Sequence, residues 1–285
     1  MTSSDWSAVS SKMSECGACF GEFRIYIRKE VKAMTNIAIC GACGKMGRVI
    51  ADIIANRSDC TVCAGIDKIT DSYADFPIVD SPDKLPAKPD VIIDFSHPST
   101  LDGLLNYCLT NGVPVVIATT GYTEEQTAQI KKAAESIPEF FTFNMSLGIN
   151  LLAELARKAA SVLEGQFDIE ILEKHHNQKL DAPSGTAIML ADAINDTLET
   201  KCSYVYDRHS VRAKRSKTEI GMHSIRGGTI VGEHEIIFAG RDEVISLKHE
   251  AHSKSVFAVG SVNAAMFISG KDKGLYAMSD MLAEV

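Results

Sequence analysis

The stretch Ile37-Ala-Ile-Cys-Gly-Ala-Cys-Gly-Lys-Met-Gly47 leads from a short apolar run into a loop with a glycine at every third position. Behind it, Val49, Ile50, Ile53 and Ile54 recur at the spacing of one helix face. A buried strand, a glycine loop and a helix in this order predict the opening unit of a nucleotide-binding α/β sheet. The free backbone N–H groups at such a helix start can hold a pyrophosphate. The spacing is G-x-x-G-x-x-G and not the more specific G-x-G-x-x-G, so an ordinary strand-to-helix turn stays the alternative.

The chain continues with the same alternation of strands and helices. Further strands are expected at 61–66, 91–95, 113–118 and 140–143, with helices at 101–108 and 124–136. This alternation predicts a parallel, doubly wound, Rossmann-like sheet over residues 35–146. Ligands of such sheets bind at the carboxyl ends of the strands. The glycine loop, Thr119-Thr120-Gly121 and Asn144-Met145-Ser146 stand at these ends.

Asp67 stands at the end of the second expected strand, 20 residues after Gly47 by sequence number. An acid at this place accepts hydrogen bonds from the adenosine ribose hydroxyls of a dinucleotide. The neighbouring Lys68 can meet a 2′-phosphate, so the pair leaves NADH and NADPH both open as cofactors. A solvated turn is the alternative.

The pattern changes after residue 146. A helix at 149–163, a strand at 168–173, a helix from Ser184 and strands at 229–238 and 243–250 have no β-α-β rhythm. They predict a smaller α+β domain with an open mixed sheet over 147–256. The segment 257–285 has helical character from Ala258 and is expected to return to the first domain.

The densest chemistry lies in Glu173-Lys-His-His-Asn-Gln-Lys-Leu-Asp-Ala-Pro-Ser-Gly-Thr186. His175 and His176 can transfer a proton near neutral pH, and Lys179 can donate one or pair with a carboxylate. The run Pro183-Ser-Gly-Thr186 begins a helix, where hydroxyl donors and free N–H groups suit an anion such as a carboxylate. A capped helix with two surface histidines is the alternative.

Other histidines are left out of the expected catalytic set. They are His223, His234 and His249, which lie on or beside expected strands. No metal site is expected at the histidine pair, because no third ligand stands at a suitable spacing.

Composition and charge exclude several classes of protein. The 285 residues carry a formal net charge of −8, which argues against general nucleic-acid binding. No run of 18 apolar residues exists, so no membrane span is expected. The eight cysteines include the C-x-x-C pairs Cys16/Cys19, Cys40/Cys43 and Cys60/Cys63. Reduced thiols of a cytoplasmic protein are the preferred interpretation of these pairs, and structural zinc is the alternative.

Residues 1–34 differ from the rest of the chain. They carry serines and scattered charges with little periodicity, and they lack the apolar core of a secretory signal. Their acidic residues are atypical of a transit peptide. We expect an unstructured or non-native extension, with Met34 as the natural start.

Several of these motifs resemble the 4-hydroxy-tetrahydrodipicolinate reductase family. The resemblance covers about residues 35–285, and the long histidine-containing run is its most specific part. The matching stretches are Gly41-Ala-Cys-Gly-Lys-Met-Gly-Arg48, Asp94-Phe-Ser96, Ala118-Thr-Thr-Gly121, Asn144-Met-Ser-Leu-Gly148, Glu173 to Ala187, Arg226 to His234 and Ser269-Gly-Lys271.

The resemblance implies an NADH- or NADPH-dependent oxidoreductase of lysine and diaminopimelate biosynthesis, with a cofactor domain, a hinged substrate domain and a homotetrameric assembly. Such an enzyme reduces the dehydrated cyclic dicarboxylate to tetrahydrodipicolinate. His175 would be the proton donor or acceptor and Lys179 the second proton donor. The implied substrate contacts are His176, Ser184, Gly185 and Thr186. The implied cofactor contacts are Gly41, Ala42, Cys43, Gly44, Lys45, Met46, Asp67, Lys68, Ala118, Thr119, Thr120, Thr142, Phe143, Asn144 and Met145.

The chain departs from the family pattern at two positions. Ala118 stands where the family often has glycine, and Lys254 stands where it often has arginine, which alone can form a bidentate carboxylate contact. Two other functions stay open. A Rossmann amino-acid dehydrogenase of another kind would lack the histidine-containing run. A non-enzymatic NAD(P)-sensing regulator would need a DNA-binding or partner-binding element.

Overall fold

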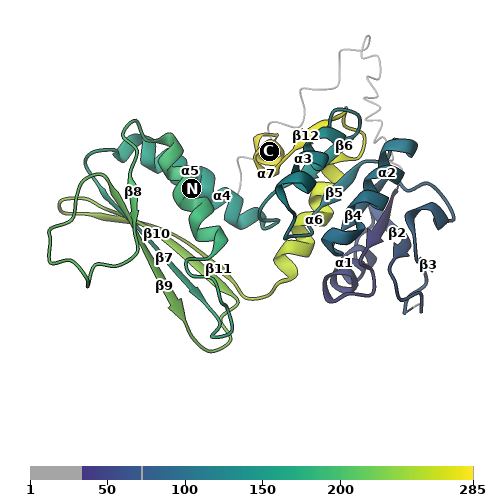
Figure 1. The fold of residues 1–285 in the computed structure, drawn as a ribbon, viewed down its shortest axis with the longest axis horizontal. Coiled ribbons are helices and arrows are strands. Elements are labelled where there is room, and N and C mark those ends of the chain that lie inside the picture. Colours follow the sequence, from purple (N-terminus) through teal and green to yellow (C-terminus); the bar gives the residue numbers. More distant parts are fainter. Residues whose placement is uncertain (1–33, 72, 285) are drawn as a thin grey trace, which may run out of the picture. The chain divides into compact units, whose positions relative to one another are not determined.

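The structure is a computed structural model, and it describes residues 34–71 and 73–284. The expectations for residues 1–33, and for Cys16 and Cys19, lie outside this part of the chain. Two sheets organise the described residues, one of seven strands and one of five (Figure 1). No helix among them has the length and apolar character needed to cross a membrane.

The seven-stranded sheet has the order β12-β6-β5-β4-β1-β2-β3, and all its pairings are parallel. Its strands are β1 (Thr35–Cys40), β2 (Cys60–Ile66), β3 (Ile78–Val79), β4 (Val91–Asp94), β5 (Val115–Ile117), β6 (Pro138–Phe141) and β12 (Gly274–Tyr276). The Rossmann-like prediction is therefore confirmed. The expected strand at 140–143 was placed two residues too late, because Pro138 and Glu139 already pair with β12.

Helices cover both faces of this sheet. On one face lie α1 (Lys45–Ala55), α6 (Ser255–Ile268) and α7 (Met278–Ala283), and on the other lie α2 (Leu101–Asn111) and α3 (Glu124–Ala133). In the structure α6 and α7, from the carboxyl-terminal part of the chain, pack on the first sheet. Cys60 lies in the core between the sheet and α1 and α6, and Cys63 packs against the core between the sheet and α2 and α3. The two side chains therefore point to opposite faces of β2, as expected for residues three apart in a strand.

The five-stranded sheet has the order β11-β10-β7-β9-β8. Its strands are β7 (Asp168–His175), β8 (Ser203–Val205), β9 (Glu219–Arg226), β10 (Gly232–Ala239) and β11 (Val244–Ala251). β10 runs antiparallel to both neighbours, whereas β7, β9 and β8 are parallel, so the predicted open mixed sheet is confirmed. β8 and β9 were not predicted, since β8 is very short and β9 mixes polar, glycine and apolar residues.

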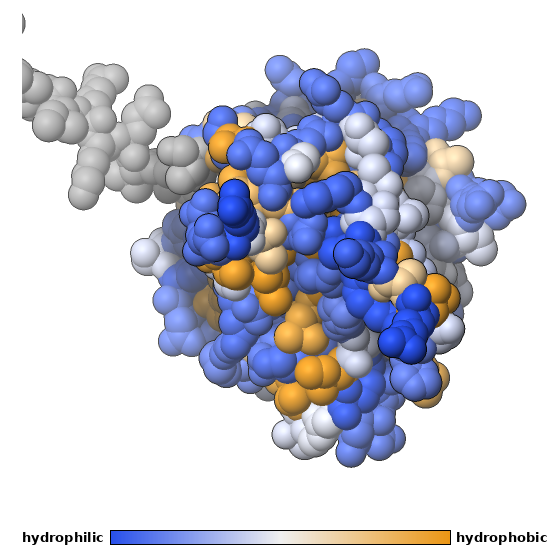
Figure 2. Space-filling view, turned by 90° about the vertical axis from the view of Figure 1, so that its left-hand side faces the viewer, coloured by the Kyte–Doolittle hydropathy of each residue, from blue (hydrophilic) through white to orange (hydrophobic). Residues whose placement is uncertain are grey.

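Helices α4 (Leu147–Leu163) and α5 (Gly185–Thr197) pack together on one face of this sheet (Figure 1). Ile169, Ile171 and Phe238 point into the core below them, in strict alternation along β7 and β10. The opposite face carries charged pairs such as Lys174 with Glu233, at 2.8 Å. Figure 2 faces the side of the molecule where the five-stranded sheet lies in Figure 1. It shows mostly hydrophilic residues with some hydrophobic ones among them.

Candidate active site

His175 was expected in a loop, and this is corrected by the structure. It is the last residue of β7, and it pairs with Arg226 on β9. Because side chains alternate along a strand, His175 and Glu173 share the face that α5 covers. Strand pairing therefore fixes the backbone of His175, while His176 opens the polar loop that follows.

The His175 ring is bonded to a buried carboxylate. Its Nδ1 lies 2.6 Å from Oε2 of Glu173, whose side chain is 1% exposed. Burial lowers the pKa of His175, the Glu173 carboxylate opposes this, and the charges of Lys179 and Arg226 lower it further. The net direction is downward, so the neutral ring is favoured near neutral pH.

Lys179 and His175 line one cavity of about 570 Å³ beside the start of α5. The Lys179 ammonium lies 2.8 Å from Oδ1 of Asp181, which is more than half exposed. Since an exposed partner is readily exchanged for another anion, Lys179 is available to a bound carboxylate. The other lining residues are Phe143, Asn144, Arg157, Ser184, Gly185, Thr186, Ile188, Met189, Asp192, Ala193 and Asp196.

The start of α5 forms one wall of this cavity. Ser184 is the N-cap, and its Oγ accepts a hydrogen bond from the Ala187 amide. The same Oγ lies 3.1 Å from Nε2 of His234 and is buried, so the Ser184 hydroxyl already has partners. Gly185 is exposed, and the Thr186 hydroxyl accepts from the side chain of Asn144. Gly185 and Thr186 therefore present the helix start to the cavity.

The glycine loop packs so closely against neighbouring backbone that two of its positions require glycine. Gly41 has φ of +84°, and a side chain there would overlap the Phe95 carbonyl. A side chain at Gly47 would overlap the carbonyl of Gly41. Helix α1 begins at Lys45 with Gly44 as N-cap and no capping side chain, which leaves its first N–H groups free for an anion.

Asp67 braces this loop as well as closing β2. Its carboxylate accepts hydrogen bonds from the amides of Cys43 and Ile69, at 2.9 and 3.2 Å. A cavity of about 560 Å³ opens beside it at the carboxyl ends of the strands. Of the expected cofactor residues, those that line this cavity are Gly41, Gly44, Asp67 and Lys68.

The remaining expected cofactor residues lie around the rim of the sheet or inside it. Thr119 is buried, and its hydroxyl accepts from the Ser96 amide at 2.8 Å. Thr120 and Phe143 are exposed, whereas Met145 is buried in the core between the seven-stranded sheet and α6. The others are Ala42, which is buried, Cys43, Met46, Ala118, Thr142 and Asn144, which are half-buried, and Lys45, which is exposed.

Sequence reasoning missed three residues that meet at His175. The His234 ring lies 5.2 Å from the His175 ring, centroid to centroid, although His234 was left out of the expected set. Arg226 and Glu173 form a two-pronged ion pair directly behind His175. The alternation of β7 could have placed Glu173 on the His175 face. The pairing of β7 with β9 and β10 could not be deduced from local pattern.

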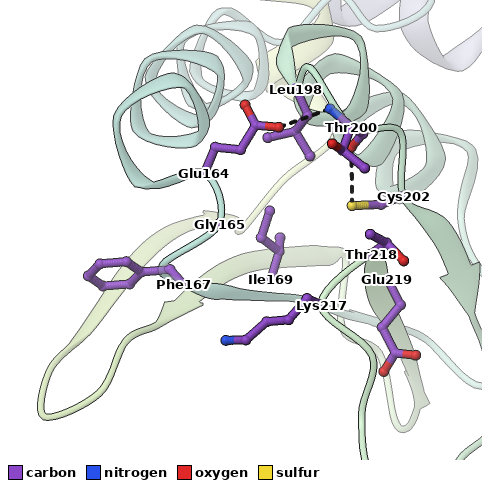
Figure 3. Close-up of a pocket in the computed structure, with 10 residues that line it drawn as sticks. All are labelled: Glu164, Gly165, Phe167, Ile169, Leu198, Thr200, Cys202, Lys217, Thr218 and Glu219. Atoms are coloured by element: carbon purple, nitrogen blue, oxygen red, sulfur yellow. Dashed lines mark hydrogen bonds between the residues drawn. The ribbon is translucent and has the colours of Figure 1, made fainter.

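A third cavity, of about 220 Å³, lies apart from these residues, where α4 ends above β7 (Figure 3). None of the expected site residues lines it. Glu164 accepts hydrogen bonds there from the amides of Glu199 and Thr200 and so ties α4 to the segment behind α5. This arrangement is explained by structural capping.

The six cysteines at positions 40 to 202 are all free thiols. Within residues 34–71 and 73–284, no group of three or more histidine, cysteine or acidic side chains is arranged to hold a metal ion.

Comparisons with known proteins show which family the chain belongs to. The family model for the dihydrodipicolinate reductase N-terminus matches residues 35–145, and the model for its C-terminus matches residues 148–282. The chain is 46% identical to the 4-hydroxy-tetrahydrodipicolinate reductase of Clostridium tetani over 253 residues, which are 89% of this chain and 99% of that protein. The enzyme of the same name from Caldanaerobacter subterraneus subsp. tengcongensis is 48% identical, over 87% and 98%.

Solved structures include one of the same enzyme name and others that share only the fold. A dipicolinate-bound dihydrodipicolinate reductase from Paenisporosarcina sp. TG-14 is 28% identical and superposes with a TM-score of 0.72, over 86% of this chain and 97% of that one. A myo-inositol dehydrogenase from Corynebacterium glutamicum is 16% identical with a TM-score of 0.53, over 85% and 90%, and shares the fold alone. With both family models matched in sequence order and close relatives covered almost end to end, the chain belongs to the dihydrodipicolinate reductase family.

Proposed function

We propose that this chain reduces the dehydrated cyclic dicarboxylate derived from 4-hydroxy-tetrahydrodipicolinate to tetrahydrodipicolinate, a step of lysine and diaminopimelate biosynthesis. The observation that carries the proposal is His175 and Lys179 on one cavity with the start of α5. Such a site offers a proton-transfer group, a cation and a helix N-terminus to an anionic ring. The family match favours this activity over another amino-acid dehydrogenase and over an NAD(P)-sensing regulator.

His175 is the proton-transfer group in this proposal, and Lys179 is the second donor. One double bond of the ring is reduced when a hydride adds to one end and a proton to the other. Because Nδ1 of His175 faces Glu173, Nε2 is the atom that gains and releases the proton. Lys179 balances the negative charge of the dicarboxylate and can deliver or replace a proton through its ammonium.

The substrate carboxylates are proposed to lie against the start of α5. The N–H groups of Gly185 and Thr186 and the dipole of the helix favour an anion at this place. His176 is half-buried and is the first residue of the loop after β7, and it serves as a further hydrogen-bond donor to a substrate carboxylate. Ser184 takes part through its cap, which fixes where the helix begins, since its hydroxyl is already engaged.

The cofactor is proposed to be NADH or NADPH, and it supplies the hydride when bound. The residues fit a dinucleotide, because the start of α1 has no capping side chain and its first N–H groups are free for a phosphate. Asp67 and Lys68 line the cavity where the adenosine ribose would lie. The remaining contacts proposed from the family resemblance are Ala42, Cys43, Lys45, Met46, Ala118, Thr119, Thr120, Thr142, Phe143, Asn144 and Met145.

The assembly and location of the protein belong to the same proposal. The outer face of the five-stranded sheet has no helix of the described residues over it, and Ile225 and Val244 stay exposed there. We therefore propose a homotetramer built on this face, which light scattering would test. Free thiols and a nicotinamide cofactor favour a cytoplasmic location. A domain division near residues 146 and 256 is also proposed, because the chain changes sheets there.

The proposed activity is tested by following NADH and NADPH oxidation with substrate generated freshly in a coupled assay. The proposal expects oxidation that depends on the cyclic substrate. Oxidation at the same rate without that substrate, or none with either cofactor, would contradict it.

A further inference from the structure

We infer that Glu173, clamped by Arg226, is a positioning residue that fixes the tautomer and orientation of His175. The inference rests on the proposed function, because it needs His175 to be the proton-transfer group. It concerns residues to which the site assignment above gives no role in the reaction.

The Glu173 carboxylate accepts hydrogen bonds on both of its oxygens. Oε2 lies 2.6 Å from His175 Nδ1 and accepts from Arg226 Nη1 at 2.8 Å. Oε1 accepts from Arg226 Nη2 at 2.7 Å and from the Ser184 amide at 3.2 Å. A two-pronged guanidinium contact leaves a carboxylate little freedom to rotate.

The clamp is itself tied to the surrounding backbone. Arg226 Nη2 also donates to the Asp181 carbonyl at 2.6 Å, and Gly227 N donates to the His175 carbonyl. Glu173 thereby connects the His175 ring with β9 and with the loop that leads into α5. A carboxylate held in this way stays ionised, because the hydrogen bonds of Arg226, Ser224 and His175 outweigh its desolvation and lower its pKa to about 2.

An ionised carboxylate on Nδ1 decides which ring nitrogen carries the proton. The neutral ring must keep its hydrogen on Nδ1 to donate to Glu173, so Nε2 holds the lone pair. Nε2 lies on the side of Gly232, where an added Cβ would stand 3.1 Å from it. Glycine at 232 therefore keeps this side of the ring free.

Arg226 also balances the effect of the carboxylate on the ring. An unpaired buried carboxylate would hold His175 protonated, whereas the paired one leaves the neutral form favoured, with the pKa of His175 lowered by burial. The charged and titratable groups around this ring are Glu173 on β7, Lys179 in the loop and Arg226 on β9. His234 on β10 and His249 on β11 line, together with His175, a separate small cavity of about 50 Å³.

The chain offers a matched control on the other face of β7. Glu170 lies 2.6 Å from His223 Nε2, and it is paired with Arg208 and Arg215. This cluster has the same residue types and a similar short contact but lies away from the cavity. Any cost of simply losing a histidine-carboxylate-arginine cluster should therefore appear in Glu170→Gln too.

The test is the pH dependence of kcat and kcat/KM for the holoenzyme with Glu173→Gln, Glu173→Asp, Arg226→Gln and Glu170→Gln, with oligomeric state checked. In Glu173→Gln, kcat should fall by roughly 10²-fold or more with cofactor affinity kept. The limb of the profile that belongs to His175 should move to lower pH in Glu173→Gln and to higher pH in Arg226→Gln. Glu173→Asp should recover part of kcat, and Glu170→Gln should match the wild type.

A folded Glu173→Gln variant with near-wild-type kcat and an unmoved profile would overturn the inference. Equal losses in Glu173→Gln and Glu170→Gln, with the oligomeric state of both unchanged, would do so as well. A shift of the pH profile in the same direction in Glu173→Gln and Arg226→Gln would also overturn it. If Glu173→Gln does not fold, the test rests on two other results. The inference then requires a shift of the pH profile to higher pH in Arg226→Gln and a measurable kcat in Glu173→Asp, and the absence of both would overturn it. Substrate-dependent oxidation by the wild type separates these outcomes from a failure of the proposed function.

Discussion

The rings of His175 and His234 lie edge to face, with centroids 5.2 Å apart and planes at 75°. His234 is buried, and its Nε2 faces the Ser184 hydroxyl, which caps α5. Ser184 Oγ also accepts from the Ala187 amide, so the His234 ring and the cap of α5 share one buried hydroxyl. His234 therefore lies between the His175 ring and the start of α5.

His234→Gln should flatten the loss of stability in acid. Burial, followed by the charge of His175, lowers the pKa of His234 from 6.5 to about 4. Unfolded chains take up a proton below 6.5 and folded ones do not, so this group costs stability as the pH falls from 6.5 to about 4. The full contribution is on the order of 3 kcal/mol.

Urea unfolding from neutral pH down to about pH 5 measures this effect. His209→Gln, at an exposed position, is the control and should follow the wild type. A His234→Gln variant that loses stability in acid as steeply as the wild type would show that protonation of His234 does not cause the loss of stability below pH 6.5.

Glu139→Met should stabilise the protein more at alkaline than at acidic pH. Glu139 lies in β6, is fully buried, and neither carboxylate oxygen has a hydrogen-bond partner among the described residues. Burial raises its pKa from 4.5 to about 8. The unfolded chain ionises above 4.5 while the folded one stays neutral, so stability is lost as the pH rises from 4.5 to about 8.

Thermal unfolding of Glu139→Met at several pH values tests this. The difference in melting temperature from the wild type should grow with pH, whereas exposed Glu135→Met should show no such trend. A gain that is constant with pH would mean that Glu139 has a partner or is ionised in the folded protein.

Asp67→Asn should shift cofactor use towards NADPH. The change removes the charge that repels a 2′-phosphate but keeps an acceptor for the Cys43 amide, which braces the glycine loop. The ratio of kcat/KM for NADPH over NADH should rise, and Lys68→Ala should lower it. An unchanged ratio in both variants would place the ribose elsewhere.

Gly232→Ala should lower kcat with little change in cofactor affinity. The added methyl would press on His175 Nε2 from 3.1 Å, whereas a methyl at Gly227 meets nothing within 4 Å. Gly227→Ala is therefore the matched control in the same region. Equal kinetics in the two variants would show that Nε2 is not the reacting nitrogen.

The five inner strands of the first sheet could be predicted, because they are short apolar runs that local pattern reveals, whereas the short edge strands β3 and β12 were not predicted. Ile37 to Cys40 and Val91 to Asp94 are examples, and both runs are buried at every position. The second sheet was harder to predict. β9 pairs in parallel with β7 across a long separation in sequence, and only that pairing makes a strand of Glu219–Arg226.

The site was predictable in its chemistry but not in its geometry. Adjacent His175 and His176 pointed to proton transfer, yet only the strand shows that they face different surroundings, one toward Glu173 and one in the loop. Arg226 and His234 come from other strands, and their approach to His175 depends on register across three strands. Contacts of this kind cannot be deduced from spacing along one segment.

The most direct test of the account is the turnover number of His175→Ala in the coupled assay, with Lys179→Ala measured beside it. Both proteins should fold and bind NADH normally, since neither residue belongs to the glycine loop. The account predicts that kcat of His175→Ala falls by roughly 10²–10⁴-fold, while Lys179→Ala also raises KM. A folded His175→Ala protein that binds cofactor and turns over at the wild-type rate would contradict it.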